Sequence, residues 1–182
     1  MQLVVAGRSM TIRFIWSLLG CAAISLTGCY ETDSAIISEG ERAPLAGRFD
    51  CKQSMDRVRE YTEFKTELDT PSYSYFNDKG EIVYLKKVID NLYIAQIIGS
   101  SHVKEGKVLY IFMEFRADGF VHLYPYLDDQ PSLKALTEQH RVKITPGAVA
   151  ALAGSNADIL RFLMGHDRTK LEQVGECVRK GA

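Results

Sequence analysis

A dense succession of strand-forming segments is the feature of this sequence that most restricts its fold. Between residues 73 and 126 the chain holds seven of its nine Tyr, with repeated Val, Ile and Phe, and Gly, Asp and Asn interrupt these runs at short intervals. Aromatic and β-branched residues in short runs separated by turn residues are typical of consecutive strands joined by hairpins. Strands are therefore expected over residues 72–76, 81–89, 92–98, 107–116 and 120–126.

The flanking segments add a strand and short helices to this region. A further strand is expected over residues 45–52, whereas residues 57–68 and 171–178 fit either a strand or a helix. Helices are expected from Ser132 to Arg141, from the Thr145–Pro146 pair to about Gly154, and from the Ser155–Asp158 capping box to Gly165. These elements predict an α+β fold, in which short C-terminal helices pack on an antiparallel β-meander or a small, partly open barrel.

The hairpin of residues 107–126 carries the candidate binding face. A three-residue turn, with Gly119 in the left-handed conformation, separates an apolar face from an aromatic and polar face and places Glu114 opposite His122. A turn of two or four residues would instead place His122 among apolar side chains. The preferred register gathers on one face Tyr110, Phe112, Glu114, His122, Tyr124 and Tyr126. This face can serve either for binding or as a structural surface covered by another strand or by the C-terminal helices.

The first 28 residues have the features of an export signal. They contain Arg8 and Arg13 and no acidic residue, followed by an apolar run over residues 14–24 that is too short to span a bilayer. The run ends in Leu-Thr-Gly-Cys at residues 26–29, which resembles the lipobox of bacterial lipoproteins. The resemblance implies that residues 1–28 are removed and that Cys29 is acylated and attached to the membrane. An ordinary secretory signal that places a cysteine after Gly28 is the alternative.

The residues around Cys29 refine this expectation. Cys21 is a weaker candidate for acylation because it lies inside the apolar run. Asp after the acylated cysteine resembles an inner-membrane retention signal in bacteria with two membranes. Here that position is Tyr30, which favours the outer membrane of the cell envelope if the organism has one. Residues 29–44 form a segment rich in acidic residues, which is expected to be a flexible tether. Residues 45–182 are expected to form a single β-rich globular domain.

Two further cysteines are expected to pair in an oxidising compartment. Cys51 and Cys177 lie near the two ends of the predicted domain, and a single pair of this kind in an exported protein most often forms a disulfide. Two separate thiols or metal ligands are the alternative, but neither cysteine lies in a CxxC motif or near a His. The sequence therefore predicts a Cys51–Cys177 disulfide and no metal site.

Composition and motifs exclude several functions. The formal net charge of the chain is -1, so the chain lacks the excess of basic residues that is typical of nucleic-acid-binding proteins. Metalloprotease, serine hydrolase, phosphate-loop and dinucleotide-binding motifs are missing from the sequence, and no cofactor is expected. His166, next to Asp167, is interpreted as a solvated helix end.

The leading hypothesis is a non-enzymatic, membrane-anchored lipoprotein that binds a protein or envelope component. The alternatives are an inhibitor of a secreted hydrolase and an enzyme that uses Glu114 and His122.

Overall fold

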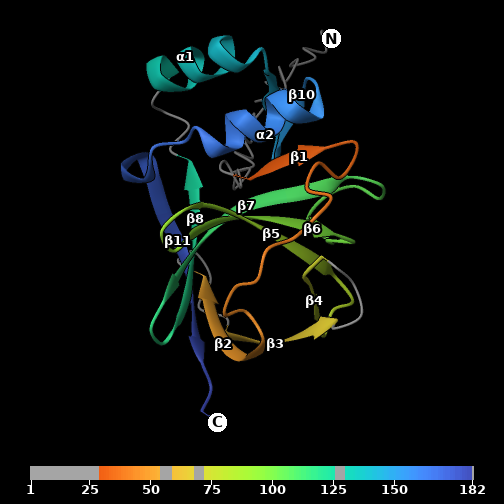
Figure 1. The fold of residues 1–182 in the computed structure, drawn as a ribbon, viewed down its shortest axis with the longest axis vertical. Coiled ribbons are helices and arrows are strands. Elements are labelled where there is room, and N and C mark those ends of the chain that lie inside the picture. Colours follow the sequence, from red (N-terminus) through yellow and green to blue (C-terminus); the bar gives the residue numbers. More distant parts are fainter. Residues whose placement is uncertain (1–28, 54–58, 68–71, 126–129, 182) are drawn as a thin grey trace, which may run out of the picture.

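The structure, a computed structural model, describes residues 29–53, 59–67, 72–125 and 130–181. The predicted signal peptide therefore lies outside the described residues. Figure 1 shows the order of the elements along the chain. The elements are β1 (Tyr30–Thr32), β2 (Gly47–Gln53), β3 (Arg59–Glu67), β4 (Ser74–Asn77), β5 (Ile82–Ile89), β6 (Leu92–Ile98), β7 (Val108–Arg116), β8 (Gly119–Pro125), α1 (Gln130–His140), β9 (Lys143–Thr145), β10 (Ala150–Ala153), α2 (Asn156–Met164), a 3-10 helix (Arg168–Lys170) and β11 (Leu171–Arg179). The predicted combination of a β-rich body and C-terminal helices is confirmed.

Eight strands form a closed antiparallel barrel in the order β2, β3, β4, β5, β6, β7, β8 and β11. The ring closes because β11 pairs with β8 on one side and with β2 on the other. Each barrel strand in the described part of the chain thus pairs with two other strands of the ring. The prediction of a meander or a partly open barrel is wrong, because the C-terminal segment 171–179 occupies the gap that would leave two strand edges unpaired.

The predicted disulfide lies at the closure of the barrel. Cys51 on β2 and Cys177 on β11 are directly opposite in the register, with their Cα atoms 4.0 Å apart, and their sulfurs are bonded. The bond joins residues 126 positions apart in the sequence. It therefore connects the first and last strands of the barrel covalently as well as through the sheet.

Aromatic and aliphatic side chains fill the barrel. This interior core draws residues from every barrel strand, among them Phe49, Phe64, Tyr75, Leu85, Tyr93, Met113, Phe115, Phe120 and Cys177. The rings of Phe49 and Phe120 meet edge to face with centroids 5.0 Å apart, and Tyr93 meets Phe115 in the same way at 5.3 Å. An eight-stranded barrel is just wide enough for side chains to fill, which agrees with this packing.

A second core lies outside the barrel wall. The outward side chains of β6, β7 and β8 pack against β1, β10 and α2, whose apolar residues include Leu152, Ile159 and Phe162. β1 pairs with the start of β7 and, in parallel, with β10. The strand β7 is consequently buried on both faces, which explains its almost uninterrupted apolar sequence.

The acidic segment after Cys29 is folded onto the barrel and is no flexible tether. Tyr30 and Ile37 are buried in the outer core. The amide side chain of Gln96 accepts hydrogen bonds from the backbone N–H groups of Ile36 and Ile37, both at 2.7 Å, and donates to the carbonyl of Ile37. Residues 30–37 therefore already belong to the folded part of the chain, which was expected to start at residue 45, because contacts with distant strands order a segment whose own sequence has no periodic pattern.

The β7–β8 hairpin has the register that the sequence argument rejected. Phe115 pairs with Phe120 and Met113 pairs with His122, so the turn between the strands has two residues and His122 points into the barrel. Gly119 has no positive φ. A Cβ atom at Gly119 would instead lie 1.9 Å from the carbonyl oxygen of Cys177. The glycine is required by the close approach of β11, a constraint that the hairpin sequence alone does not contain.

The region after β8 also differs in part from the prediction. The helix expected after Thr145 is absent from this described stretch, where β9 and β10 form a hairpin that pairs with β1. The expected helix from Ser155 to Gly165 is confirmed, because the Ser155 side chain accepts from the Asp158 N–H and Gly165 ends α2. None of the helices in the described ranges is long and apolar enough to cross a membrane.

Replacing Cys51 and Cys177 together by Ala is expected to lower the free energy of unfolding by about 4 to 5 kcal/mol. A bridge that closes a loop of this length restricts the unfolded chain strongly. Urea denaturation of the oxidised wild type and of the double variant measures the difference. Added reductant should lower the wild-type midpoint and leave the variant unchanged, whereas equal midpoints for the two oxidised proteins would contradict the bridge.

Gly119→Ala is expected to destabilise the fold by about 1 to 3 kcal/mol or more, because its methyl group meets the β11 backbone. Gly181→Ala is the matched control, since a Cβ there has nothing within 4 Å, and its effect should stay below about 0.5 kcal/mol. Thermal or urea unfolding compares the two variants. Equal stabilities would show that β11 does not approach β8 this closely.

Candidate functional site

The predicted binding face on the β7–β8 hairpin is divided between the two sides of the barrel wall. Tyr110 and Phe112 point outward but are buried beneath β1 and α2, each about 1% exposed. The Tyr110 hydroxyl donates to Gln96 Oε1 at 3.0 Å and lies 3.2 Å from the donating Thr32 hydroxyl. These two aromatic residues therefore belong to the outer core and are unavailable to a partner.

Glu114 pairs with an arginine and does not meet His122. The Arg168 guanidinium donates two hydrogen bonds to the Glu114 carboxylate, at 3.2 and 2.5 Å. These bonds, supported by the charges of Arg168 and Arg116, lower the pKa of Glu114 below its usual value. Glu114 points outward while His122, paired with Met113, points inward. The structure therefore places the two residues on opposite sides of the barrel wall instead of opposite each other.

His122 and Tyr124 belong to the barrel interior. The His122 ring lies 5.3 Å from the Phe120 ring, and burial lowers the pKa of His122 to about 4. The Tyr124 hydroxyl hydrogen-bonds the buried thiol of Cys29, and burial raises the pKa of both groups, that of Cys29 to about 11. Tyr126, the last predicted member of the binding face, lies outside the described residues.

His166 is packed among aromatic rings and is no solvated helix end. Its ring centroid is 5.0 Å from that of Phe162 and 5.3 Å from that of Phe112, and its Nε2 atom is 3.3 Å from the Tyr30 hydroxyl. Burial lowers the pKa of His166 to about 4. The imidazole is therefore neutral near pH 7 and acts as a core residue.

A strap of residues 40–46 covers one end of the barrel. Its Glu41 N–H donates to the Leu85 carbonyl at 2.7 Å, and its Leu45 side chain is fully buried in the interior core. A Cβ at Gly40 would lie 2.0 Å from the Tyr73 carbonyl oxygen, so only glycine fits at that crossing. The strap then leads directly into β2.

Two side chains from distant strands hold the strap in place. The Tyr75 hydroxyl donates to the Ala43 carbonyl and accepts from the Ala43 N–H, both at 2.7 Å. Arg179, at the end of β11, donates to the carbonyls of Pro44 and Ala46 at 2.7 Å and lies over the Phe49 ring. Both contacts join the strap to the barrel through residues far away in the sequence.

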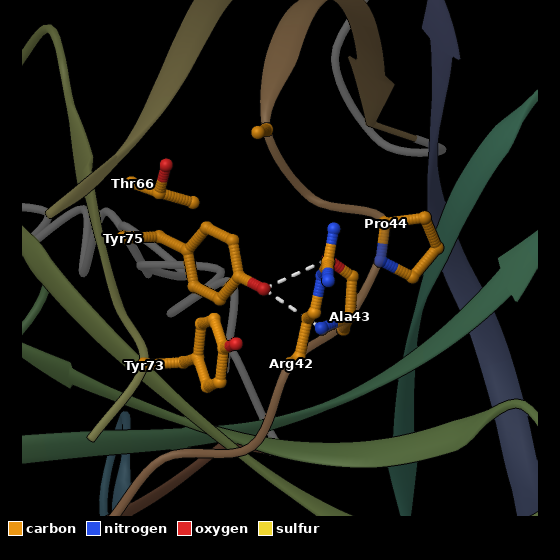
Figure 2. A pocket seen from close by; sticks show the side chains of 7 residues that line it. Arg42, Ala43, Pro44, Thr66, Tyr73 and Tyr75 are labelled. Carbon is orange, nitrogen blue, oxygen red and sulfur yellow. Dashed lines mark hydrogen bonds between the residues drawn. The ribbon is translucent and has the colours of Figure 1, made fainter. Parts of the chain in front are cut away.

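A pocket of about 560 Å³ opens between this strap and the neighbouring strands. Figure 2 shows Tyr73 and Tyr75 on one side of it, facing the strap on the other. The residues that line it are Arg42, Ala43, Pro44, Ala46, Thr66, Tyr73 and Tyr75. Its volume falls within the range of roughly 300 to 1,000 Å³ that is usual for small-molecule sites, and its lining of aromatic and small apolar groups with a few polar ones is also typical of them.

None of the seven lining residues was predicted as functional from the sequence. Arg42, Ala43 and Pro44 fall in the segment predicted as a flexible acidic tether and Ala46 in the strand predicted over residues 45–52, and the strap reaches Tyr75 only through the tertiary fold. The one local signal is the Tyr73–Tyr75 spacing, which places two rings on the same side of an extended chain. Among the residues that the structure describes, no group of three or more His, Cys, Asp or Glu side chains is placed to hold a metal ion.

Comparisons of the chain with protein-family models, with curated proteins and with solved structures find no match. The interpretation of the pocket therefore depends on its own geometry and chemistry.

Acidification is expected to destabilise the protein through His122 and His166, two half-buried histidines that pack against aromatic rings. Both have a pKa of about 4 in the folded state, below the value of about 6.5 for an unfolded chain, so unfolding takes up protons between these values. The contribution of the two neutral histidines to the free energy of unfolding should be fully present above about pH 6.5. It should fall as the pH drops toward 4, by about 3 kcal/mol for each histidine.

Urea unfolding of wild type and His166→Gln at pH 7, 5.5 and 4.5 measures this loss. The variant should start less stable at pH 7 but lose only about half as much stability on acidification. His102→Gln, in an exposed loop, is the matched control and should retain the wild-type pH dependence. The same pH dependence in His166→Gln and wild type would contradict the burial of a neutral His166.

Proposed function

We propose that the protein is a lipid-anchored, non-enzymatic binding module of a bacterial cell envelope. In this proposal residues 1–28 are an export signal, Cys29 carries the lipid, and the pocket beside the strap receives a small envelope component. Tyr30 after Cys29 favours attachment to the outer membrane in a bacterium that has one. The separation of Glu114 from His122 supports binding over catalysis, because it removes the acid–base pair that an enzymatic mechanism would have used.

The positions of Cys29 and the pocket carry this proposal. Cys29 comes directly before β1, which lies with α1 and α2 toward one end of the long axis of the molecule (Figure 1). The residues that line the pocket include the strap before β2 and Thr66 near the end of β3, and β2 and β3 lie toward the opposite end (Figure 1). A lipid on Cys29 would therefore leave the pocket facing away from the membrane and open to a diffusing ligand.

Attachment of a lipid requires Cys29 to turn out of the barrel. Its side chain is about 4% exposed and hydrogen-bonds the Tyr124 hydroxyl. Among the described residues, the backbone of Cys29 is held by a hydrogen bond that its carbonyl accepts from the Ala150 N–H, at 3.0 Å, whereas Tyr30 onward belongs to β1. Rotation about the bonds of this single residue can release the thiol while β1 stays paired. In the acylated protein the Tyr124 hydroxyl then loses its thiol partner.

Metabolic labelling with a radioactive fatty acid tests the anchor. The full chain expressed in a bacterium should incorporate label and sediment with membranes, because two or more acyl chains give stable attachment. Cys29→Ala should lose both the label and the membrane association. Cys21→Ala, which leaves residues 26–29 intact, is the matched control and should keep both. Equal labelling of wild type and Cys29→Ala would overturn the proposal.

A further inference from the structure

We propose that the pocket beside the strap binds a small planar ring that bears an oxyanion, either a carboxylate or a phosphate. This inference rests on the proposed binding function and specifies the chemical class of the ligand. It follows from three features of the described residues: a guanidinium at the pocket that forms no ion pair with their carboxylates, a lining of aromatic and small apolar groups, and a second arginine, Arg179, bound to the strap.

Arg42 supplies the group that would recognise the oxyanion. It lines the pocket, it is exposed, and no acidic side chain among the described residues forms an ion pair with it. The neighbouring Glu41 cannot neutralise it, because the Glu41 carboxylate is bound to the Lys86 ammonium and accepts from the Lys87 N–H at 3.1 Å. Arginine binds carboxylate and phosphate through two parallel N–H bonds, so Arg42 suits either oxyanion.

The lining of the pocket suits a planar ring. Tyr75 is fully buried and its hydroxyl is occupied by the Ala43 backbone, so it supports the pocket wall and leaves Tyr73 as the ring that a ligand can reach. Tyr73 is 39% exposed, and no hydrogen bond to its hydroxyl is found within the described parts of the chain. Ala43, Pro44 and Ala46 supply the opposite, apolar wall. A ring can therefore lie against aromatic and aliphatic surfaces while the Tyr73 and Thr66 hydroxyls remain available for polar substituents.

Arg179 adds a second positive charge beside the strap. Arg179 holds the strap through the carbonyls of Pro44 and Ala46, and within the described ranges its guanidinium forms no ion pair with a carboxylate. Arg42 and Arg179 therefore both favour an anion at this end of the barrel. A cationic ligand would be repelled by the same two charges, and a neutral ring would leave Arg42 without a partner.

Calorimetric titration of the purified full-length protein in detergent tests the ligand class. Benzoate and phenyl phosphate are the anionic probes, and benzyl alcohol is the neutral ring of similar size. Both anions should bind at least about 10-fold more tightly than benzyl alcohol, since a charge-assisted hydrogen bond contributes a factor of this order. Arg42→Gln should remove that preference and leave the weak binding of benzyl alcohol unchanged.

Arg48→Gln is the matched control, because Arg48 is an exposed arginine that pairs with Glu63 on the outer wall of the barrel. It should bind the anions as the wild type does. Equal binding of all three probes, or equal losses in the Arg42 and Arg48 variants, would overturn the oxyanion assignment and leave the pocket as a binding site of another class. Absence of binding by all three probes to the folded protein would overturn the ligand class and the pocket together, while the fatty-acid label tests the anchor separately.

Discussion

The pairing of β11 with β2 on one side and β8 on the other is the interaction on which the rest of this structure depends. It turns a row of antiparallel strands into a ring and encloses an interior lined from every strand. The Cys51–Cys177 disulfide joins the same two strands covalently at directly opposite residues. Gly119 allows the approach, because any side chain there would collide with the β11 backbone. Sheet pairing, a covalent bond and a steric requirement thus act together where β11 joins β2 and β8.

The features with a functional interpretation depend on this closure. Arg179 at the end of β11 holds the strap, which forms one wall of the pocket, through the Pro44 and Ala46 carbonyls, and it can do so only if β11 lies beside β2. The closed ring also gives β7 a fixed outer face on which β1 and α2 pack. Cys29 is thereby held on one side of the barrel and Arg42 on another. The proposed anchor and the proposed oxyanion site are then two consequences of one arrangement of strands.

Local patterns in the sequence predict much of this fold, and long-range contacts account for the rest. The strands between residues 73 and 125 follow from runs of aromatic and β-branched residues separated by turn residues, and the capped helix α2 follows from the Ser155–Asp158 pair. Both signals act over a few residues. The register of the β7–β8 hairpin does not follow from the local sequence, because glycine is required at position 119 by the close approach of β11 and not by the turn itself. The strap likewise has no periodic pattern and is ordered by Tyr75 and Arg179. The candidate site lies in the part of the fold that only tertiary structure creates.

Amide hydrogen exchange along β11 in the oxidised full-length protein tests the closure most directly. Successive N–H groups of a strand point to opposite edges, so a strand with two neighbours protects every amide and a strand with one neighbour protects alternate amides. The ladders to β2 and β8 both include residues 175–178. Slow exchange at four consecutive amides there is the predicted result. Alternating fast and slow exchange over these residues would contradict the closed barrel and the pocket that depends on it.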